Sequence, residues 1–149
     1  MKKEIDPRMH SAEHILNQTM VRIFNCGRSF NAHIEKKKSK CDYHFDRALT
    51  EQEITAIENQ VNDIIRASMP VTEEYLPRGA SQQRYNLDRL PHDAGDEIRI
   101  VKIGDYDACP CIGPHVNSTK EIGTFRIVSA GYENGVLRVR FKLAQSAQQ

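Results

Sequence analysis

The sequence predicts an α+β fold in which two long helices pack on an antiparallel sheet. Two stretches carry apolar side chains at helical spacing, one near the N-terminus and one after Thr50. The C-terminal third alternates apolar and charged residues after Asn134-Gly135, a pair typical of tight hairpin turns. A chain of 149 residues can bury the core of one domain, so residues 1–149 are predicted to form a single domain.

The first helix is predicted over residues 7–24. The Asp6 side chain can cap its first backbone N–H groups, and Pro7 has the fixed φ angle of a first helical turn. Gly27 is expected to end the helical region. The apolar side chains that recur at helical spacing between these signals are Ala12, Ile15, Leu16, Met20, Ile23 and Phe24.

The second helix is predicted to follow Thr50, because Thr50 and Glu53 have the spacing of a capping box. Pro70 cannot continue a helix and is expected to stop it. The apolar stripe that predicts its buried face consists of Ile54, Ile57, Val61, Ile64 and Ile65.

The remaining elements are shorter. Residues 29–46 are predicted to form two short strands around a lysine-rich turn, and residues 70–76 are expected to be extended. Residues 77–96 are polar and turn-rich, with a short helix expected near Gln82 to Leu87. Further strands are predicted at residues 97–106 and on both sides of the hairpin turn within 123–143, and residues 144–149 are expected to be a flexible tail.

The charge balance excludes a strong field over the whole molecule, because 21 lysines and arginines are matched by 20 aspartates and glutamates. A polyanionic partner would therefore need a local basic patch. No apolar run approaches the roughly 20 residues that span a bilayer, and the N-terminal MKKEIDPR lacks the apolar segment of a signal peptide. These features predict a cytoplasmic protein with no membrane partner, whose cysteines are reduced thiols or metal ligands.

Two histidines are four residues apart in MHSAEHIL, so His10 and His14 lie on one face of the predicted helix and can both reach a metal ion. Taken alone, such a pair is more often an ordinary polar helix face. In CPCIGPHVNST, however, Cys111 and His115 repeat the spacing within a Gly-Pro turn. Three imidazoles and one thiolate form a tetrahedral set that suits zinc, provided that the fold brings the two distant pairs together.

Several alternatives stay open at this point. Cys109 could replace or join Cys111 as a ligand, although a bystander role is the more common one for such a residue. His33, His44 and His92 have no partner at ligand spacing and are predicted to be ordinary polar residues. Zinc hydrolases often have three protein ligands and an open position, whereas a closed set of four is usually structural, and composition does not decide between the two.

Two segments together indicate a family. HSAEH near the N-terminus and CIGPHVNSTKEIGTFRI near the C-terminus resemble the HxxxH and CxxxH signature of the editing domain shared by alanyl- and threonyl-tRNA synthetases. The segment DRALTEQEITAIENQVNDIIRASMPV resembles the long helix of that domain, so the resemblance covers residues 5–143. It implies the fold of the editing domain. Because the chain has no room for a synthetase catalytic domain, it is similar to short, free-standing trans-editing proteins of the AlaX type.

The resemblance implies that His10, His14, Cys111 and His115 bind one zinc ion and that Cys109 is a neighbour that does not bind it. It also implies hydrolysis, without ATP, of the ester that joins a wrong amino acid to the terminal ribose of a tRNA. The expected substrate is the acceptor end of a mischarged tRNA, first of all Ser-tRNA(Ala). A synthetase as a further partner and the oligomeric state are left open.

One departure from the family pattern puts the tRNA identity in doubt. Ile112-Gly113-Pro114 replaces the Gly-Gly-Thr of many alanine-type members, and its Gly-Pro-His ending resembles the threonine-type domain. An editor of Ser-tRNA(Thr) is therefore one alternative. A second is a non-catalytic, zinc-stabilised module that binds tRNA or a synthetase. A zinc hydrolase of small esters or amides is disfavoured, because no independent nucleophile motif is found.

Candidate substrate-pocket residues are Ser11 and Glu13 on the histidine helix and Thr119 and Glu121 after the Cys-His turn, because a pocket that hydrogen-bonds serine can reject alanine. Ser11 and Thr119 could instead close turns, and Glu13 could be an exposed helix carboxylate. Phosphate contacts with tRNA could come from the lysine-rich turn and the outward face of the last strand, and each group could equally be only solvated. These basic candidates are Lys36, Lys37, Lys38, Lys40, Arg138, Arg140 and Lys142.

Overall fold

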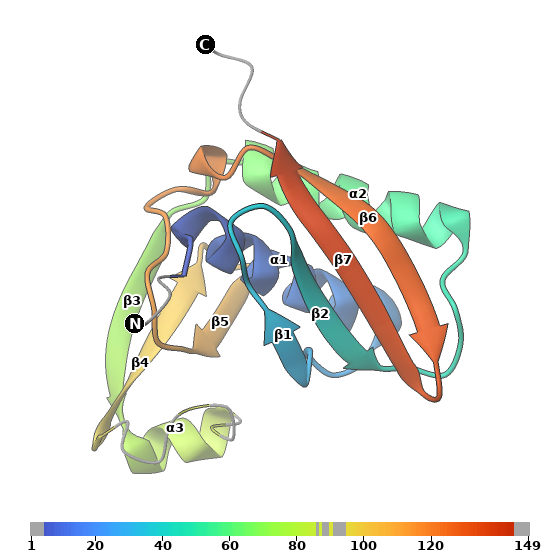
Figure 1. The fold of residues 1–149 in the computed structure, drawn as a ribbon. Coiled ribbons are helices and arrows are strands. Elements are labelled where there is room, and N and C mark those ends of the chain that lie inside the picture. The colour runs from blue at the N-terminus through green and yellow to red at the C-terminus, as the bar shows by residue number, and fades with distance from the viewer. Residues whose placement is uncertain (1–4, 86, 88–89, 91–94, 145–149) are drawn as a thin grey trace.

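The computed structural model describes residues 5–85, 87, 90 and 95–144 (Figure 1). None of the helices in these ranges is long and apolar enough to cross a membrane. In chain order the elements are α1 (Pro7–Phe24), β1 (Asn31–His33), β2 (Ser39–His44), α2 (Glu51–Arg66), β3 (Val71–Pro77), α3 (Arg78–Arg84), β4 (Glu97–Ile103), β5 (Asp107–Pro110), the 3₁₀ helix η1 (Thr119–Glu121), β6 (Thr124–Glu133) and β7 (Val136–Ala144).

Helix α1 has the predicted bounds. The carboxylate of Asp6 accepts hydrogen bonds from the backbone N–H groups of Arg8 at 2.9 Å and Met9 at 3.2 Å, which satisfies two donors of the first turn. At the other end Asn25, not Gly27, adopts the left-handed conformation that ends the helix, with a φ of 56°. Asparagine tolerates this conformation better than most residues with a side chain.

Helix α2 starts with the predicted capping box. The Thr50 hydroxyl accepts a hydrogen bond from the Glu53 N–H at 3.1 Å, and the Glu53 carboxylate accepts one from the Thr50 N–H at 2.9 Å. The buried stripe contains Ile57, Val61, Ile64 and Ile65, so the predicted apolar face packs into the core.

The α+β class is confirmed, and the antiparallel strands divide between two sheets instead of forming one. The four-stranded sheet has the order β1-β2-β7-β6, and the three-stranded sheet has the order β3-β4-β5. The smaller sheet gains its third strand because a turn at Gly104, with a φ of 50°, folds β5 directly back on β4. Outside the named strands, one isolated bridge between Pro70 and Ser118 is found in the described residues.

The turn at Gly104 also corrects two predicted elements. The strand expected over 97–106 ends at Ile103, and β5 was not predicted. The short helix α3 lies at Arg78–Arg84, earlier than the predicted Gln82 to Leu87, part of which lies outside the described residues. Of the predicted tail, Ala144 belongs to β7 and residues 145–149 lie outside the described residues.

The core lies between the two long helices and the inner face of the four-stranded sheet (Figure 1). On β7 the side chains of Leu137, Val139 and Phe141 are fully buried and alternate with basic residues on the outer face. Asn134 and Gly135 form the predicted β6–β7 turn, both with positive φ. One face of this sheet therefore packs under the helices, and the other presents positive charge.

Candidate metal centre

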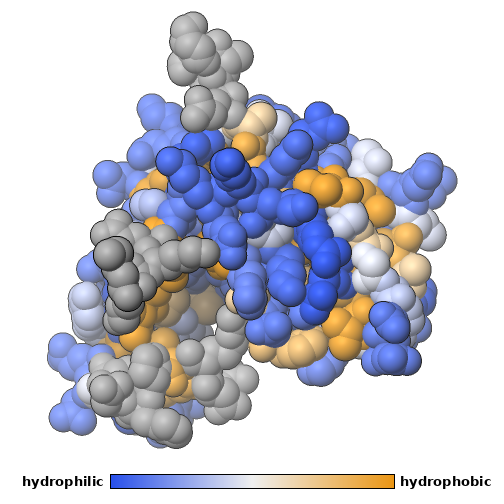
Figure 2. Space-filling model, in the orientation of Figure 1, coloured by the Kyte–Doolittle hydropathy of each residue, from blue (hydrophilic) through white to orange (hydrophobic). Residues whose placement is uncertain are grey.

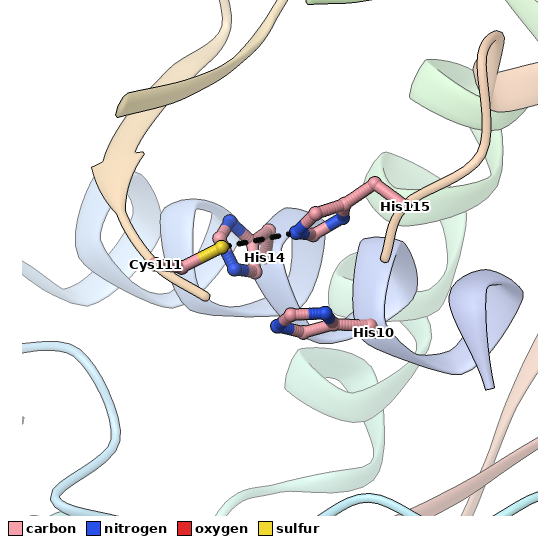
Figure 3. Close-up of side chains that lie close together, drawn as sticks. All are labelled: His10, His14, Cys111 and His115. Carbon is pink, nitrogen blue, oxygen red and sulfur yellow. Dashed lines mark hydrogen bonds between the residues drawn. The ribbon is translucent and has the colours of Figure 1, made fainter. Parts of the chain in front are cut away.

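Four side chains from two distant parts of the chain converge between α1 and the loop that follows β5 (Figure 3). His10, His14, Cys111 and His115 each offer one ligand atom, and these atoms all lie within 4.8 Å of one another. The Cys111 sulfur lies 3.2 Å from Nε2 of His115, and the rings of His10 and His115 stack with centroids 4.0 Å apart. The structure thus brings together the two pairs that the sequence separates.

Helix α1 supplies half of the group. Because positions four apart in a helix share a face, His10 and His14 point toward the same space, and both are buried. Cys111 and His115 come from the irregular loop between β5 and η1 and are partly buried. A rigid element and a tight loop therefore each contribute two ligand atoms.

The loop is shaped to approach His10 closely. Nδ1 of His10 lies 3.0 Å from the Pro114 carbonyl oxygen, which can only accept, so Nδ1 carries the hydrogen and Nε2 keeps a free lone pair. Gly113 has a φ of 116°, and a Cβ there would lie 3.1 Å from Cε1 of His10. Arg99 fixes this part of the loop by donating to the Gly113 carbonyl at 2.7 Å, while it also bonds Glu73 at 2.9 Å.

Ser11 orients His115. Its hydroxyl oxygen lies 2.9 Å from Nδ1 of His115 and accepts a hydrogen bond from the backbone N–H of Val116 at 3.2 Å. With Nδ1 turned to Ser11, Nε2 of His115 faces the Cys111 sulfur and the other two imidazoles. Contacts of this kind fix the orientation of metal-binding histidines.

Asp107 lies beside His14, at ion-pair distance and not within hydrogen-bond distance. Nδ1 of His14 has no hydrogen-bond partner in the described residues, and it lies 3.6 Å from a carboxylate oxygen of Asp107. Asp107 in turn accepts hydrogen bonds from Arg28 at 2.7 Å and from Gln18 at 2.8 Å. Burial alone would raise the pKa of Asp107, but its contacts with His14 and Arg28 outweigh this effect and hold the pKa well below its usual range. Asp107 is therefore a carboxylate at neutral pH.

Burial shifts the pKa values of three of the four candidate ligands, His10, His115 and Cys111, toward their uncharged forms. Burial, reinforced by the neighbouring His14, lowers the pKa of His10 to about 4 and that of His115 to about 2. Burial also raises the pKa of the Cys111 thiol to about 12. At neutral pH these two imidazoles are uncharged, and the thiol loses its proton when a cation arrives.

These shifts predict that the metal-free protein loses stability in mild acid. Because His10 and His115 bind protons more weakly when folded than when unfolded, their contribution is complete above pH 6.5 and is lost as the pH falls below it. Between pH 7 and pH 5 we expect a loss of about 2 kcal/mol for each histidine. Urea unfolding in the presence of a chelator, at half-unit pH steps, measures this loss. An unfolding free energy that stays constant from pH 7 to pH 5 would contradict it.

The donor set fits a zinc ion. Zinc binds nitrogen and sulfur at about 2.0–2.3 Å in a tetrahedron, which separates its ligand atoms by roughly 3.3–3.8 Å. The observed spread of up to 4.8 Å needs only small side-chain rotations to reach this range. Three imidazoles and one cysteine sulfur are also the ligand types that zinc prefers. The group could therefore hold a metal ion such as zinc.

The four predicted pocket residues lie in different surroundings. The Glu121 carboxylate accepts a hydrogen bond from the Ser118 N–H at 3.0 Å. Glu13 is 6% exposed, with a carboxylate oxygen 4.0 Å from Nε2 of His10. Ser11 is fully buried against His115, as described above. Thr119 is also fully buried, and its hydroxyl donates to the Ile64 carbonyl at 2.9 Å at the C-terminal end of α2. A role for these residues in a substrate pocket stays a prediction.

The predicted tRNA-binding residues separate into groups. Lys36, Lys37 and Lys38 are exposed in the β1–β2 turn, whereas Lys40 and Arg140 are partly buried. Arg138 forms two hydrogen bonds with the Asp42 carboxylate, at 2.8 and 3.0 Å, so its charge is already compensated. The hydrogen bond from Arg138 lowers the pKa of Asp42, which keeps this pair ionised. Contact of these lysine and arginine side chains with tRNA stays a prediction.

The other candidates lie outside the four-residue group. The Cys109 sulfur lies 3.4 Å from the Pro110 carbonyl oxygen and is not one of the converging atoms. His44 stacks on Phe30 with ring centroids 3.9 Å apart, and His92 lies outside the described residues. Asp107 and Arg99 were missed. The one sequence signal for Asp107 is its position, as an acidic residue just before the Cys-x-Cys segment. No local pattern in the sequence marks Arg99.

Residues 98–140 match the family described as the second additional domain of threonyl and alanyl tRNA synthetases. The chain is 33% identical over 141 residues to an alanine-tRNA ligase of Fervidobacterium nodosum, which covers 93% of this chain and 16% of the ligase. It is 33% identical over 129 residues to the alanine-tRNA ligase of Leptospira biflexa, which covers 82% of this chain and 13% of that ligase. It is 28% identical over 144 residues to the alanine-tRNA ligase of Methanopyrus kandleri, which covers 94% of this chain and 16% of that ligase.

The chain therefore spans about one-sixth of these relatives, and nearly all of it is matched there. The resemblance predicted from these motifs is confirmed: residues 98–140 match the second additional domain of threonyl and alanyl tRNA synthetases, and nearly the whole chain is similar to a small segment of alanine-tRNA ligases.

Proposed function

We propose that this protein is a zinc-dependent aminoacyl-tRNA deacylase, a carboxylic ester hydrolase that clears mischarged tRNA and so protects translation fidelity. The observation that carries the proposal is the convergence of three imidazoles and one thiol in a chain of this synthetase domain family. We propose Ser-tRNA(Ala) as the substrate, because the relatives named above are alanine-tRNA ligases. A substrate shared with ligases of translation also favours the cytoplasm as the place of action.

His10, His14, Cys111 and His115 are the proposed ligands of one zinc ion. A bound zinc ion would supply positive charge that orients the substrate or polarises water. Because the chain offers four ligand atoms, we favour orientation of the substrate over activation of a water at an open position.

An ester is already activated, so the protein needs mainly to hold the reacting groups in place. The Glu13 carboxylate lies beside the proposed ligands, 4.0 Å from Nε2 of His10. We assign it the task of holding the α-ammonium group of the substrate or a proton released from water. Ser11 and Asp107 act one step away, because they keep the imidazoles of His115 and His14 turned toward the centre.

The test is the release of labelled serine from Ser-tRNA(Ala) by zinc-loaded protein. We expect rapid release of serine and release of alanine from Ala-tRNA(Ala) at least about 100-fold more slowly, because a site that hydrogen-bonds the serine hydroxyl leaves polar groups unpaired when alanine is bound. Ser-tRNA(Thr) is the matched control for tRNA identity.

Each alternative has its own outcome in this assay. Faster release from Ser-tRNA(Thr) than from Ser-tRNA(Ala) would indicate the threonine-type editor. No release from either tRNA by folded, zinc-loaded protein would reject the hydrolase and leave a zinc-stabilised binding module.

A further inference from the structure

A hollow of about 150 Å³ opens on the outer face of the four-stranded sheet, beside the β1–β2 turn. This volume is well below the roughly 300–1,000 Å³ of pockets that hold whole small molecules, so the hollow suits one small group. Three cationic side chains and a single carboxylate, Glu35, contribute to its wall. The lining residues are His33, Glu35, Lys38, Ser39, Lys40 and Arg140.

Two of these cations oppose each other directly. Lys40 on β2 and Arg140 on β7 are cross-strand partners, and like charges at such positions repel and destabilise a sheet. The next pair along the same strands that faces outward, Asp42 and Arg138, is by contrast an opposite-charge pair with two hydrogen bonds. Neither the Lys40 nor the Arg140 side chain has an ion-pair partner in the described residues. An anion placed between them would remove the repulsion.

The β1–β2 turn is held in shape beside this hollow. The Ser39 hydroxyl accepts a hydrogen bond from the Glu35 N–H at 2.9 Å and donates one to the Glu35 carbonyl at 3.0 Å. It also lies 3.4 Å from the sulfur of Met9, which precedes His10 in α1. The hollow is therefore preorganised, and one of its lining residues contacts the residue that precedes His10. Figure 2 shows that hydrophilic side chains gather on this face, over β2 and β7.

We propose that this hollow binds a phosphodiester of the tRNA 3′ end, with Lys40 and Arg140 as its direct contacts. The inference rests on the proposed function. It separates the basic residues that would contact phosphate from those that would not, a distinction that composition alone does not make. Lys36 and Lys37, in the same turn, do not line the hollow, and Arg138 is neutralised by Asp42. Phosphate binding is thus assigned to one position on the sheet and not to a diffuse basic surface.

The experiment compares two double variants that each remove two positive charges. Lys40→Gln with Arg140→Gln removes the two opposed cations of the hollow and leaves Lys38. Lys36→Gln with Lys37→Gln is the matched control in the same turn. Binding of an uncharged acceptor-stem minihelix with a single-stranded 3′ end is measured across a salt series. For the hollow variant we expect roughly tenfold weaker binding and a salt slope smaller by about 0.7–1, and for the control less than about a twofold change.

Melting temperature and zinc content of both variants verify the fold. Relief of the like-charge pair predicts that the hollow variant melts at or above the wild-type temperature, so weaker binding there cannot be explained by unfolding. Equal losses in the two variants would indicate a diffuse field and overturn the proposal, as would unchanged binding of the hollow variant. Inorganic phosphate is titrated as a competitor of the minihelix. If phosphate displaced the minihelix at a phosphate concentration equal to or below that of the minihelix, the hollow would be assigned to a free anion instead.

The proposed function fails separately. Minihelix binding that depends on Lys40 and Arg140, without serine release from Ser-tRNA(Ala), would reject the hydrolase and keep the phosphate site. Serine release whose KM is the same in the wild type and the hollow variant would keep the hydrolase and reject the site.

Discussion

Replacement of Cys111 by alanine is expected to reduce zinc content from one ion per chain to nearly none and to slow serine release from Ser-tRNA(Ala) by at least about 100-fold. The thiolate is the one anionic donor in the group, and its loss leaves three neutral imidazoles to hold a divalent cation. Metal analysis of the purified variant and single-turnover deacylation measure the two effects. His10→Ala is expected to behave in the same way, because His10 belongs to the other half of the group.

Cys109→Ala is the matched control, since Cys109 is a partly buried thiol two residues away that lies outside the converging atoms. We expect this variant to keep its zinc and its activity. If Cys109→Ala lost zinc and Cys111→Ala retained it, the ligand assignment would be wrong. If Cys111→Ala lost zinc and kept full activity, the metal would be structural.

Replacement of Asp107 by alanine is expected to lower the unfolding free energy of the metal-free protein by about 3 kcal/mol, the lower end of the range for a broken buried ion pair. The Asp107 side chain is completely buried, whereas Arg28 keeps 29% of its side-chain surface exposed, so water can partly compensate the arginine that remains. The variant also loses the group that orients His14, and zinc affinity is expected to fall by about 10- to 100-fold.

Urea unfolding with a chelator measures the first effect of this substitution, and competition with a chromogenic zinc chelator measures the second. Asp63→Ala is the matched control, because Asp63 pairs with Arg66 on the exposed surface of α2 and should contribute less than about 0.5 kcal/mol. If both variants lost the same unfolding free energy, the buried ion pair of Asp107 would stabilise the protein no more than an exposed pair does. Unchanged zinc affinity in Asp107→Ala would remove Asp107 from the metal centre.

Local interactions explain what could be predicted about the fold. The caps at Asp6 and Thr50 and the Asn134-Gly135 turn depend on residues within a few positions of one another, so the sequence displays them directly. The periodicity of β7 likewise fixed which of its side chains enter the core. Predictions failed where a single turn decides the pairing, because the turn at Gly104 ends β4 and creates β5 as the third strand of the small sheet.

By itself the sequence determined the α+β class, the two long helices, the hairpin, the family resemblance and the residue types of the candidate metal centre. Only the tertiary structure decided that His14 meets Cys111, that Asp107 and Arg99 support them, and that Lys40 opposes Arg140. The physical reason is the range of the interactions. Helix caps and periodicity depend on residues that are near one another in the sequence. The contacts of the metal centre join segments that come together only when the helices and both sheets have packed, so residue spacing does not predict them.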